Sequence, residues 1–102
     1  MIVVFWTCGN IEEARRVGRL LVEQHLVACV NIIPEIESLY WWEGKVASDK
    51  EVKVLLKTTR ERFKAVRELI QREASYDLPE ITFIELTGGS KEYLDWVRAA
   101  TR

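Results

Sequence analysis

The sequence predicts a small α+β domain in which two helices cover one face of a four-stranded antiparallel sheet. Two observations support this prediction. Segments with strand periodicity and segments with helical periodicity alternate in the order β-α-β-β-α-β, followed by a short C-terminal helix. No linker, low-complexity stretch or internal repeat divides residues 1–102, so we expect a single domain. This order packs most simply as a ferredoxin-like sandwich.

The first strand and the first helix have clear signals. Residues 2–7, IVVFWT, form a continuous apolar and β-prone run, which is typical of a strand buried on both faces. Asn10 with Glu13 three residues later resembles a capping box. Apolar residues then recur at helical spacing, so we expect the helix to continue to about residue 25.

The next two β segments are unusually long. They cover about residues 28–42 and 46–58, and Glu43-Gly44 between them suits a tight hairpin. Residues 28–42 would span about 50 Å if fully extended, whereas a 15-residue helix spans only about 22 Å. The hairpin should therefore project beyond the helices unless it bends. A bulge or bend is expected at Pro34, because proline cannot donate to a strand ladder.

The remaining elements complete the sandwich. Thr59 is expected to cap a second helix with an apolar stripe. Pro79 precedes a fourth strand, residues 80–86 with the sequence EITFIEL, and Ser90 is expected to start the short last helix.

Both faces of the second β segment are apolar. One sequence parity contains Ala28, Val30, Ile32, Ile36, Tyr40 and Trp42, and the other contains Cys29, Ile33, Leu39 and Trp41. Helices can cover only one face, and soluble monomers rarely expose large apolar patches. We therefore expect self-association. The alternative is that the C-terminal helix folds under the sheet and covers the second face.

Composition excludes several classes of function. Fifteen basic and sixteen acidic residues alternate along the chain, so no face resembles a track for nucleic-acid phosphates. The apolar start MIVVFWT is too short for a signal peptide or a membrane span, which favours the cytoplasm, where both cysteines would stay reduced. No nucleophile–base or acid–base constellation can be named, so an enzyme is not expected.

The segments LVACVNIIPEIESLYWWEGKV, VLLKTT, YDLPEI and YLDWV together resemble the CutA family of divalent-cation tolerance proteins. The resemblance covers essentially the whole chain. It implies a ferredoxin-like fold assembled as a compact homotrimer, with long hairpins that wrap onto neighbouring subunits, as in PII-like signalling proteins. It also implies a response to, and binding of, copper or other divalent metal ions. No catalytic residues and no obligatory cofactor come with it.

The resemblance also suggests one metal ligand. Cys29 matches the cysteine of the family's A-C-x-N block, but Ala74 stands where the family has a histidine. A thiolate without a second soft ligand makes a poor copper site, so we expect weak binding. Candidates for a second ligand are Cys8, the only histidine (His25) and a residue of the adjacent subunit. Alternatively, Cys29 is a small hydrophobe in a strand, and His25 is a helix-terminal residue favoured by the dipole.

The aromatic run Tyr40-Trp41-Trp42 has two interpretations. These side chains can anchor a subunit interface, in which aromatic residues are enriched. They can instead wall a ligand cleft between subunits. Polar contacts in such a cleft would come from Lys57, Tyr76 and Glu80. Three functions therefore stay open: a metal-binding tolerance protein, a PII-like sensor of a small molecule, and a partner-binding scaffold.

Overall fold

The computed structural model describes residues 1–102 as four strands and three α-helices. In chain order the elements are β1 (Ile2–Cys8), α1 (Ile11–Glu23), β2 (Cys29–Trp42), β3 (Lys45–Thr58), a 3₁₀ turn (Arg60–Arg62), α2 (Phe63–Glu73), β4 (Ile81–Glu85) and α3 (Lys91–Ala100). This order confirms the predicted α+β class.

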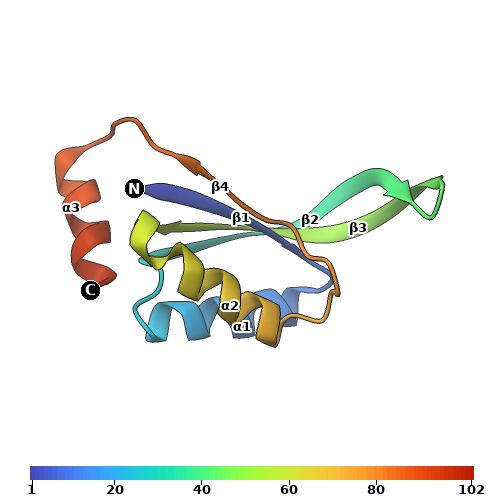
Figure 1. The fold of residues 1–102 in the computed structure, drawn as a ribbon, viewed down its shortest axis with the longest axis horizontal. Helices are drawn as coiled ribbons and strands as arrows, with labels where there is room; N and C mark the ends of the chain where they lie inside the picture. Colours follow the sequence, from blue (N-terminus) through green and yellow to red (C-terminus); the bar gives the residue numbers. More distant parts are fainter.

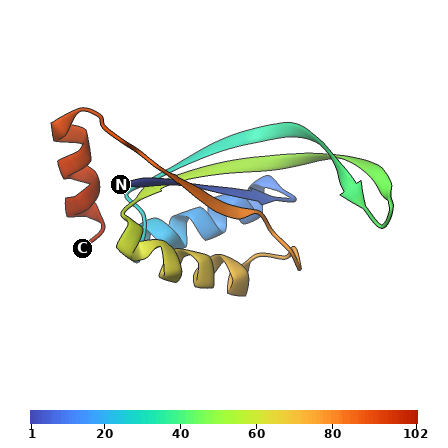
Figure 2. The same cartoon turned by 45° about the horizontal axis from the view of Figure 1, so that its top comes forward.

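The strands form one antiparallel sheet in the order β2-β3-β1-β4. Helices α1 and α2 lie side by side against one face, which completes the ferredoxin-like sandwich (Figures 1 and 2). The other face, here called the open face, has no helix along its length. Figure 2 shows α3 standing at one end of the sheet, near the N-terminus.

The hydrophobic core fills the space between the sheet and the two helices. Alternate residues of the central strands β1 and β3 point into it and are fully buried, among them Val4, Trp6, Val54 and Leu56. Burial of such side chains contributes about 1.5–3 kcal/mol each to folding. The part of the chain in which α1 and α2 cover the sheet is therefore stabilised by its own core, as the sequence periodicity predicts.

The hairpin of β2 and β3 extends well beyond the helices, as predicted (Figure 1). Its register changes between Ile33, which pairs with Lys53, and Ile36, which pairs with Glu51. Three residue steps along β2 therefore match two along β3, so β2 contains a one-residue bulge at Pro34-Glu35. Such an insertion moves every following side chain of the strand to the other face.

The bulge corrects the prediction that Val30, Ile32, Ile36, Tyr40 and Trp42 lie on one face. Val30 and Ile32 pack against the core on the helix side. Beyond the bulge, the even-numbered residues of β2 oppose the odd-numbered residues of β3, which belong to the open face. The aromatic side chains Tyr40 and Trp42 consequently lie on the side of the open face.

The hairpin turn confirms the role predicted for Glu43-Gly44. Glu43 and Gly44 have φ angles of 50° and 77°, so both adopt the left-handed conformation of tight hairpin turns. Trp41 and Trp42, immediately before the turn, are 75% and 55% exposed in the single chain.

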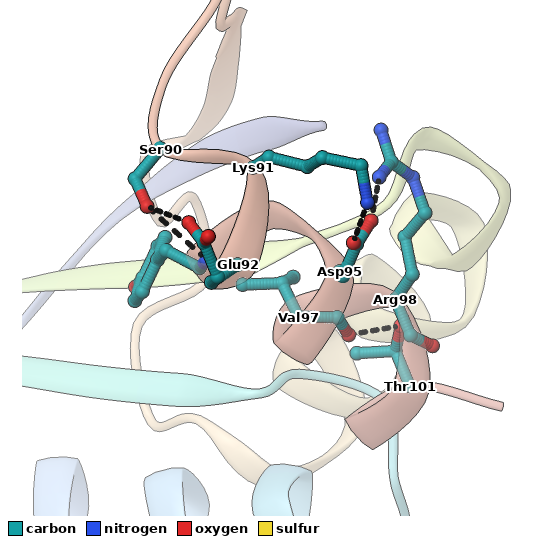
Figure 3. A network of polar contacts seen from close by, with 8 residues as sticks. Ser90, Lys91, Glu92, Asp95, Val97, Arg98 and Thr101 are labelled. Atoms are coloured by element: carbon teal, nitrogen blue, oxygen red, sulfur yellow. Dashed lines mark hydrogen bonds and ion pairs between the residues drawn. The ribbon is translucent and has the colours of Figure 1, made fainter.

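Helix α3 is held at the end of the sheet by its own caps and by contacts with the sandwich. Figure 3 shows Ser90 at its start and the ion pairs of Asp95 with Lys91, at 2.7 Å, and with Arg98, at 3.3 Å. At its other end, the carbonyl oxygen of Thr101 accepts a 2.6 Å hydrogen bond from Arg62 Nε.

The position of α3 leaves much of the open face uncovered. Ile33 and Ile84, from the two edge strands, are 42% and 53% exposed. The alternative in which the C-terminal helix folds under the sheet is therefore wrong for this chain.

Two details differ from the sequence prediction. Thr59 makes no side-chain capping hydrogen bond, because the chain first forms the 3₁₀ turn 60–62 and α2 begins only at Phe63. The first strand runs one residue beyond the predicted range 2–7 and ends at Cys8. Cys8 is 1% exposed, because it continues the core-facing parity of the strand.

Candidate functional site

A cleft of about 690 Å³ begins on the open face at the base of the hairpin and extends along the hairpin to Trp42, next to the turn. Aromatic residues at the end of β2, namely Tyr40, Trp41 and Trp42, form part of its lining. β3 contributes polar side chains, and the segment 75–80 between α2 and β4 adds Tyr76 and Glu80. Residues far apart in the sequence thus meet where the hairpin leaves the sandwich.

Two tyrosine hydroxyl groups each bind a carboxylate in this cleft. Tyr76 Oη donates a 2.9 Å hydrogen bond to Glu51 Oε2, and Tyr40 Oη donates to Asp49 Oδ2. Burial, followed by the hydrogen bond to Glu51, raises the pKa of Tyr76, and the hydrogen bond to Asp49 raises that of Tyr40. Both phenols therefore stay protonated at neutral pH and act as donors toward the carboxylates.

Glu80 is the centre of a second polar group in the cleft. Its Oε1 accepts hydrogen bonds from Lys53 Nζ at 2.7 Å and from Thr7 Oγ1 at 3.0 Å, and its Oε2 accepts one from Thr82 Oγ1 at 3.0 Å. Burial alone would raise the pKa of the Glu80 carboxyl. The hydrogen bonds outweigh burial and hold the pKa below its ordinary value of 4.5.

Local packing fixes the segment that carries Tyr76. A Cβ atom at Gly9 would lie 3.2 Å from the ring and hydroxyl atoms of Tyr76, so the ring rests against bare backbone. The neighbouring Ser75 N–H donates a 3.0 Å hydrogen bond to Oε1 of the buried Glu13 side chain on α1. The tyrosine is therefore positioned by Gly9, between β1 and α1, and by Glu13 of α1.

The structure brings together four of the five residues that the sequence suggested for a cleft: Tyr40, Trp42, Tyr76 and Glu80. Lys57 does not belong to this group. It lies farther along β3, where it pairs across the strands with Cys29, and its Nζ donates to Asn31 Oδ1. The register of the hairpin separates Lys57 from the cleft.

The polar residues of the cleft that sequence reasoning missed include Asp49, Glu51 and Lys53 on β3. Their signal is present in the sequence, because they alternate along one strand and must share a face. The bulge places Tyr40 and Trp42 on that same face, so the aromatic residues of β2 meet the polar residues of β3.

Cys29, the candidate metal ligand, lies at the other end of the open face. It is half-buried, and its Sγ lies 3.8 Å from Asn31 Oδ1. Nowhere in the chain do three or more His, Cys, Asp or Glu side chains gather in a geometry suited to a metal ion. Ala74, at the position of the family histidine, packs against the core. Within one chain, Cys29 therefore belongs to no cluster of three ligating side chains.

Cys8 and His25, the other candidate ligands of the chain, have surroundings of their own. Cys8 points into the core on the helix side, whereas Cys29 belongs to the open face. Burial and, to a smaller extent, the Glu13 charge raise the pKa of the Cys8 thiol to about 11. His25 follows the end of α1, and its Nδ1 lies 3.1 Å from the carbonyl oxygen of Ala100. Its ring therefore ties α1 to α3.

The fold and the cleft define a class: ferredoxin-like α+β proteins whose long, bulged β2–β3 hairpin carries the lining of a cleft. The sequence profile described as "CutA1 divalent ion tolerance protein" matches residues 2–100. The chain belongs to this CutA1 family. No helix in it reaches the length and apolarity that crossing a bilayer requires.

Individual relatives agree with this assignment. The divalent-cation tolerance protein CutA of Thermus thermophilus is 41% identical over 99 residues, which cover 97% of this chain and 96% of that protein. The chloroplastic CutA 1 of rice is 41% identical over 99% of this chain, but the chain spans only 57% of its length.

Solved structures of relatives show the same fold. The Thermus thermophilus CutA1 structure superposes with a TM-score of 0.96 at 41% identity, with both chains fully covered. The periplasmic divalent cation tolerance protein CutA of Archaeoglobus fulgidus superposes with a TM-score of 0.96 at 38% identity, again with both chains fully covered.

The two cysteines should differ sharply in reactivity. We expect a thiol reagent at pH 8 to label at most one thiol per native chain, because the buried Cys8 is protonated at that pH. Labelling should persist in Cys8→Ala, disappear in Cys29→Ala, and reach both thiols of the parent after unfolding. Rapid labelling of native Cys29→Ala would contradict the position of Cys8.

The hydrogen bonds of Glu80 should make stability depend on pH. Because its pKa is lower in the folded chain, its contribution is present above about pH 4.5 and is lost as the pH falls through the folded pKa. Glu80→Gln should therefore lower the free energy of unfolding at pH 7 by less than about 1 kcal/mol, since the Lys53 pair is partly exposed. This difference from the parent should shrink below pH 4 in thermal melts.

Glu85→Gln is a matched control for this measurement, because Glu85 forms an exposed ion pair with Arg60 outside the cleft. A Glu80→Gln deficit that is absent at pH 7, or that grows on acidification, would show that the network around Glu80 does not stabilise the fold.

Proposed function

We propose that this chain acts as a homotrimeric divalent-cation tolerance protein that responds to copper or another divalent metal ion and binds it weakly through Cys29. The observation that carries the proposal is the position of Cys29, a half-buried thiol on a sheet face that one chain leaves open. A neighbouring subunit on that face could supply the second ligand that the chain itself lacks. The relatives named as divalent-cation tolerance proteins support the same reading.

The uncovered apolar surface supports assembly. Ile33 and Ile84 are exposed on the open face, and Leu39, Trp41, Trp42 and Val46 are exposed on the projecting hairpin, between 55% and 75% each for the last four. Patches of this size normally mark interaction sites. The likeness to PII-like proteins suggests three subunits, with each hairpin reaching a neighbour.

Two further elements complete the proposal. We assign no catalytic role, because the only histidine contacts a backbone carbonyl beside α3 and lies outside the cleft. The cytoplasm stays our proposed compartment, since Cys29 must be a free thiol to take up a soft metal. Relatives carry names that place them in chloroplasts or in the periplasm.

A second candidate function rests on the cleft at the base of the hairpin. Its concave shape, aromatic lining and few convergent polar groups are the features of a small-molecule site. In this alternative the assembly senses a ligand, as a PII-like protein does, and needs no tight metal site.

Copper titration tests the metal proposal. We expect isothermal titration under reducing, oxygen-free conditions to show weak copper(I) binding, because the metal must displace the thiol proton and lacks a second ligand within the chain. Cys29→Ala should abolish this binding, whereas His25→Ala should change it little. Tight stoichiometric binding that survives Cys29→Ala would overturn the assignment.

Light scattering tests the assembly. We expect a trimer at micromolar concentration.

The melting of Trp42→Ala tests whether a neighbour covers the hairpin. We expect this substitution to lower the free energy of unfolding by on the order of 3 kcal/mol through lost burial and a cavity. In the single chain Trp42 is 55% exposed, so a cost of that size requires a neighbour. A monomer, or a Trp42→Ala protein that melts like the parent, would contradict the proposed covering of the hairpin.

A further inference from the structure

The cleft at the base of the hairpin has a strongly asymmetric charge. The acidic and basic side chains of its lining are Asp49, Glu51, Lys53, Asp77 and Glu80. Lys53 and Glu80 lie 2.7 Å apart and neutralise each other. Three carboxylates then remain without a basic side chain in the lining. The cleft therefore favours a positively charged ligand over an anion.

The hydrogen bonds inside the cleft leave room for such a ligand. Tyr40 and Tyr76 each bind one oxygen of a carboxylate, Asp49 Oδ2 and Glu51 Oε2. The second oxygen of each carboxylate makes no hydrogen bond within the chain, so it can accept one from a ligand. Both tyrosines also hold their carboxylates in fixed orientations.

Aromatic rings make up much of the remaining lining. In the single chain Trp41 and Trp42 are largely exposed, and Tyr40 and Tyr76 are each 37% exposed, so one chain by itself leaves ring surface available in the cleft. Aromatic faces attract cations, and tryptophan does so most strongly. Aromatic faces and free carboxylate oxygens are complementary to a group that combines positive charge, N–H donors and an apolar chain.

We propose that this cleft binds a small organic cation with an ammonium or guanidinium group. The proposal deepens the second candidate function above and rests on it. The charged end would donate hydrogen bonds to Glu51 and Asp49, and an aliphatic portion would lie against Trp42. A bare divalent metal ion fits less well, because the chain does not gather three ligating side chains in a metal geometry there.

Agmatine tests this proposal, since it carries an ammonium group, a guanidinium group and a short aliphatic chain. Its binding to the intact assembly is measured by isothermal titration and by tryptophan fluorescence, with two of the four tryptophans in the cleft. Magnesium chloride, which supplies a cation of equal charge without N–H donors, and succinate, an anion of similar length, serve as control titrants. We expect saturable binding of agmatine only.

Variants locate the binding. Glu51→Gln and Asp49→Asn should each weaken agmatine binding about tenfold, because each removes a charged acceptor. Trp42→Leu should weaken it as well and should reduce the fluorescence change. Glu92→Gln, a loss of the same charge on the outer surface of α3, should bind as the parent does. Circular dichroism checks that each variant is folded.

Several results would overturn the proposal: no saturation by agmatine up to millimolar concentration, an equal response to magnesium, or unchanged affinity in both Glu51→Gln and Asp49→Asn. Cys29→Ala separates this test from the copper test. Agmatine binding that persists in Cys29→Ala supports the cleft whether or not copper binds the parent, and its loss in that variant would count against the cleft.

Discussion

The one-residue bulge at Pro34-Glu35 is the constraint on which the rest of the structure depends. Without it, the side chains of β2 would keep one parity, and Tyr40 and Trp42 would continue the core-facing row of Val30 and Ile32. With it, the hairpin changes faces where it leaves the helices. Its aromatic residues then lie with the acidic residues of β3, and the cleft forms.

The same change of face explains why a chain with an adequate core still exposes large aromatic side chains. The helices bury Trp6, Leu56 and their neighbours completely, so the sandwich is stabilised on that side. Neither α1 nor α2 reaches the part of the hairpin that projects beyond the sandwich, and α3 is held at the end of the sheet (Figure 1). Covering the open face and the hairpin is therefore left to a second chain, which is the physical basis of the proposed assembly.

The sequence predicts the elements well because periodicity and turn residues are local signals. The order of the elements along the chain, the hairpin turn at Glu43-Gly44 and a bulge at Pro34 follow from such signals. The consequence of the bulge does not, because whether one residue is inserted depends on pairing with β3 and not on β2 alone. For the same reason the sequence did not indicate that Asp49 and Glu51 line the cleft. It also did not indicate that Lys57 pairs with Cys29, away from the cleft. The burial of Cys8 does not follow from the apolar run 2–7 either, because β1 continues one residue farther than that run.

The two candidate sites, Cys29 and the cleft, lie at opposite ends of the open face, so a subunit packed on that face would affect both. Cys29 and Lys57 share a row across the open face, and Lys53, Thr7 and Glu80 gather farther along the same strands toward the hairpin. The row between them contains Leu55 and Phe5, which are apolar and belong to the surface proposed to meet a neighbour. A chain packed there would approach Cys29 on one side and the cleft on the other. Neither a second ligand for Cys29 nor a closed wall for the cleft is present in one chain, so the proposed assembly would complete both sites in the same step.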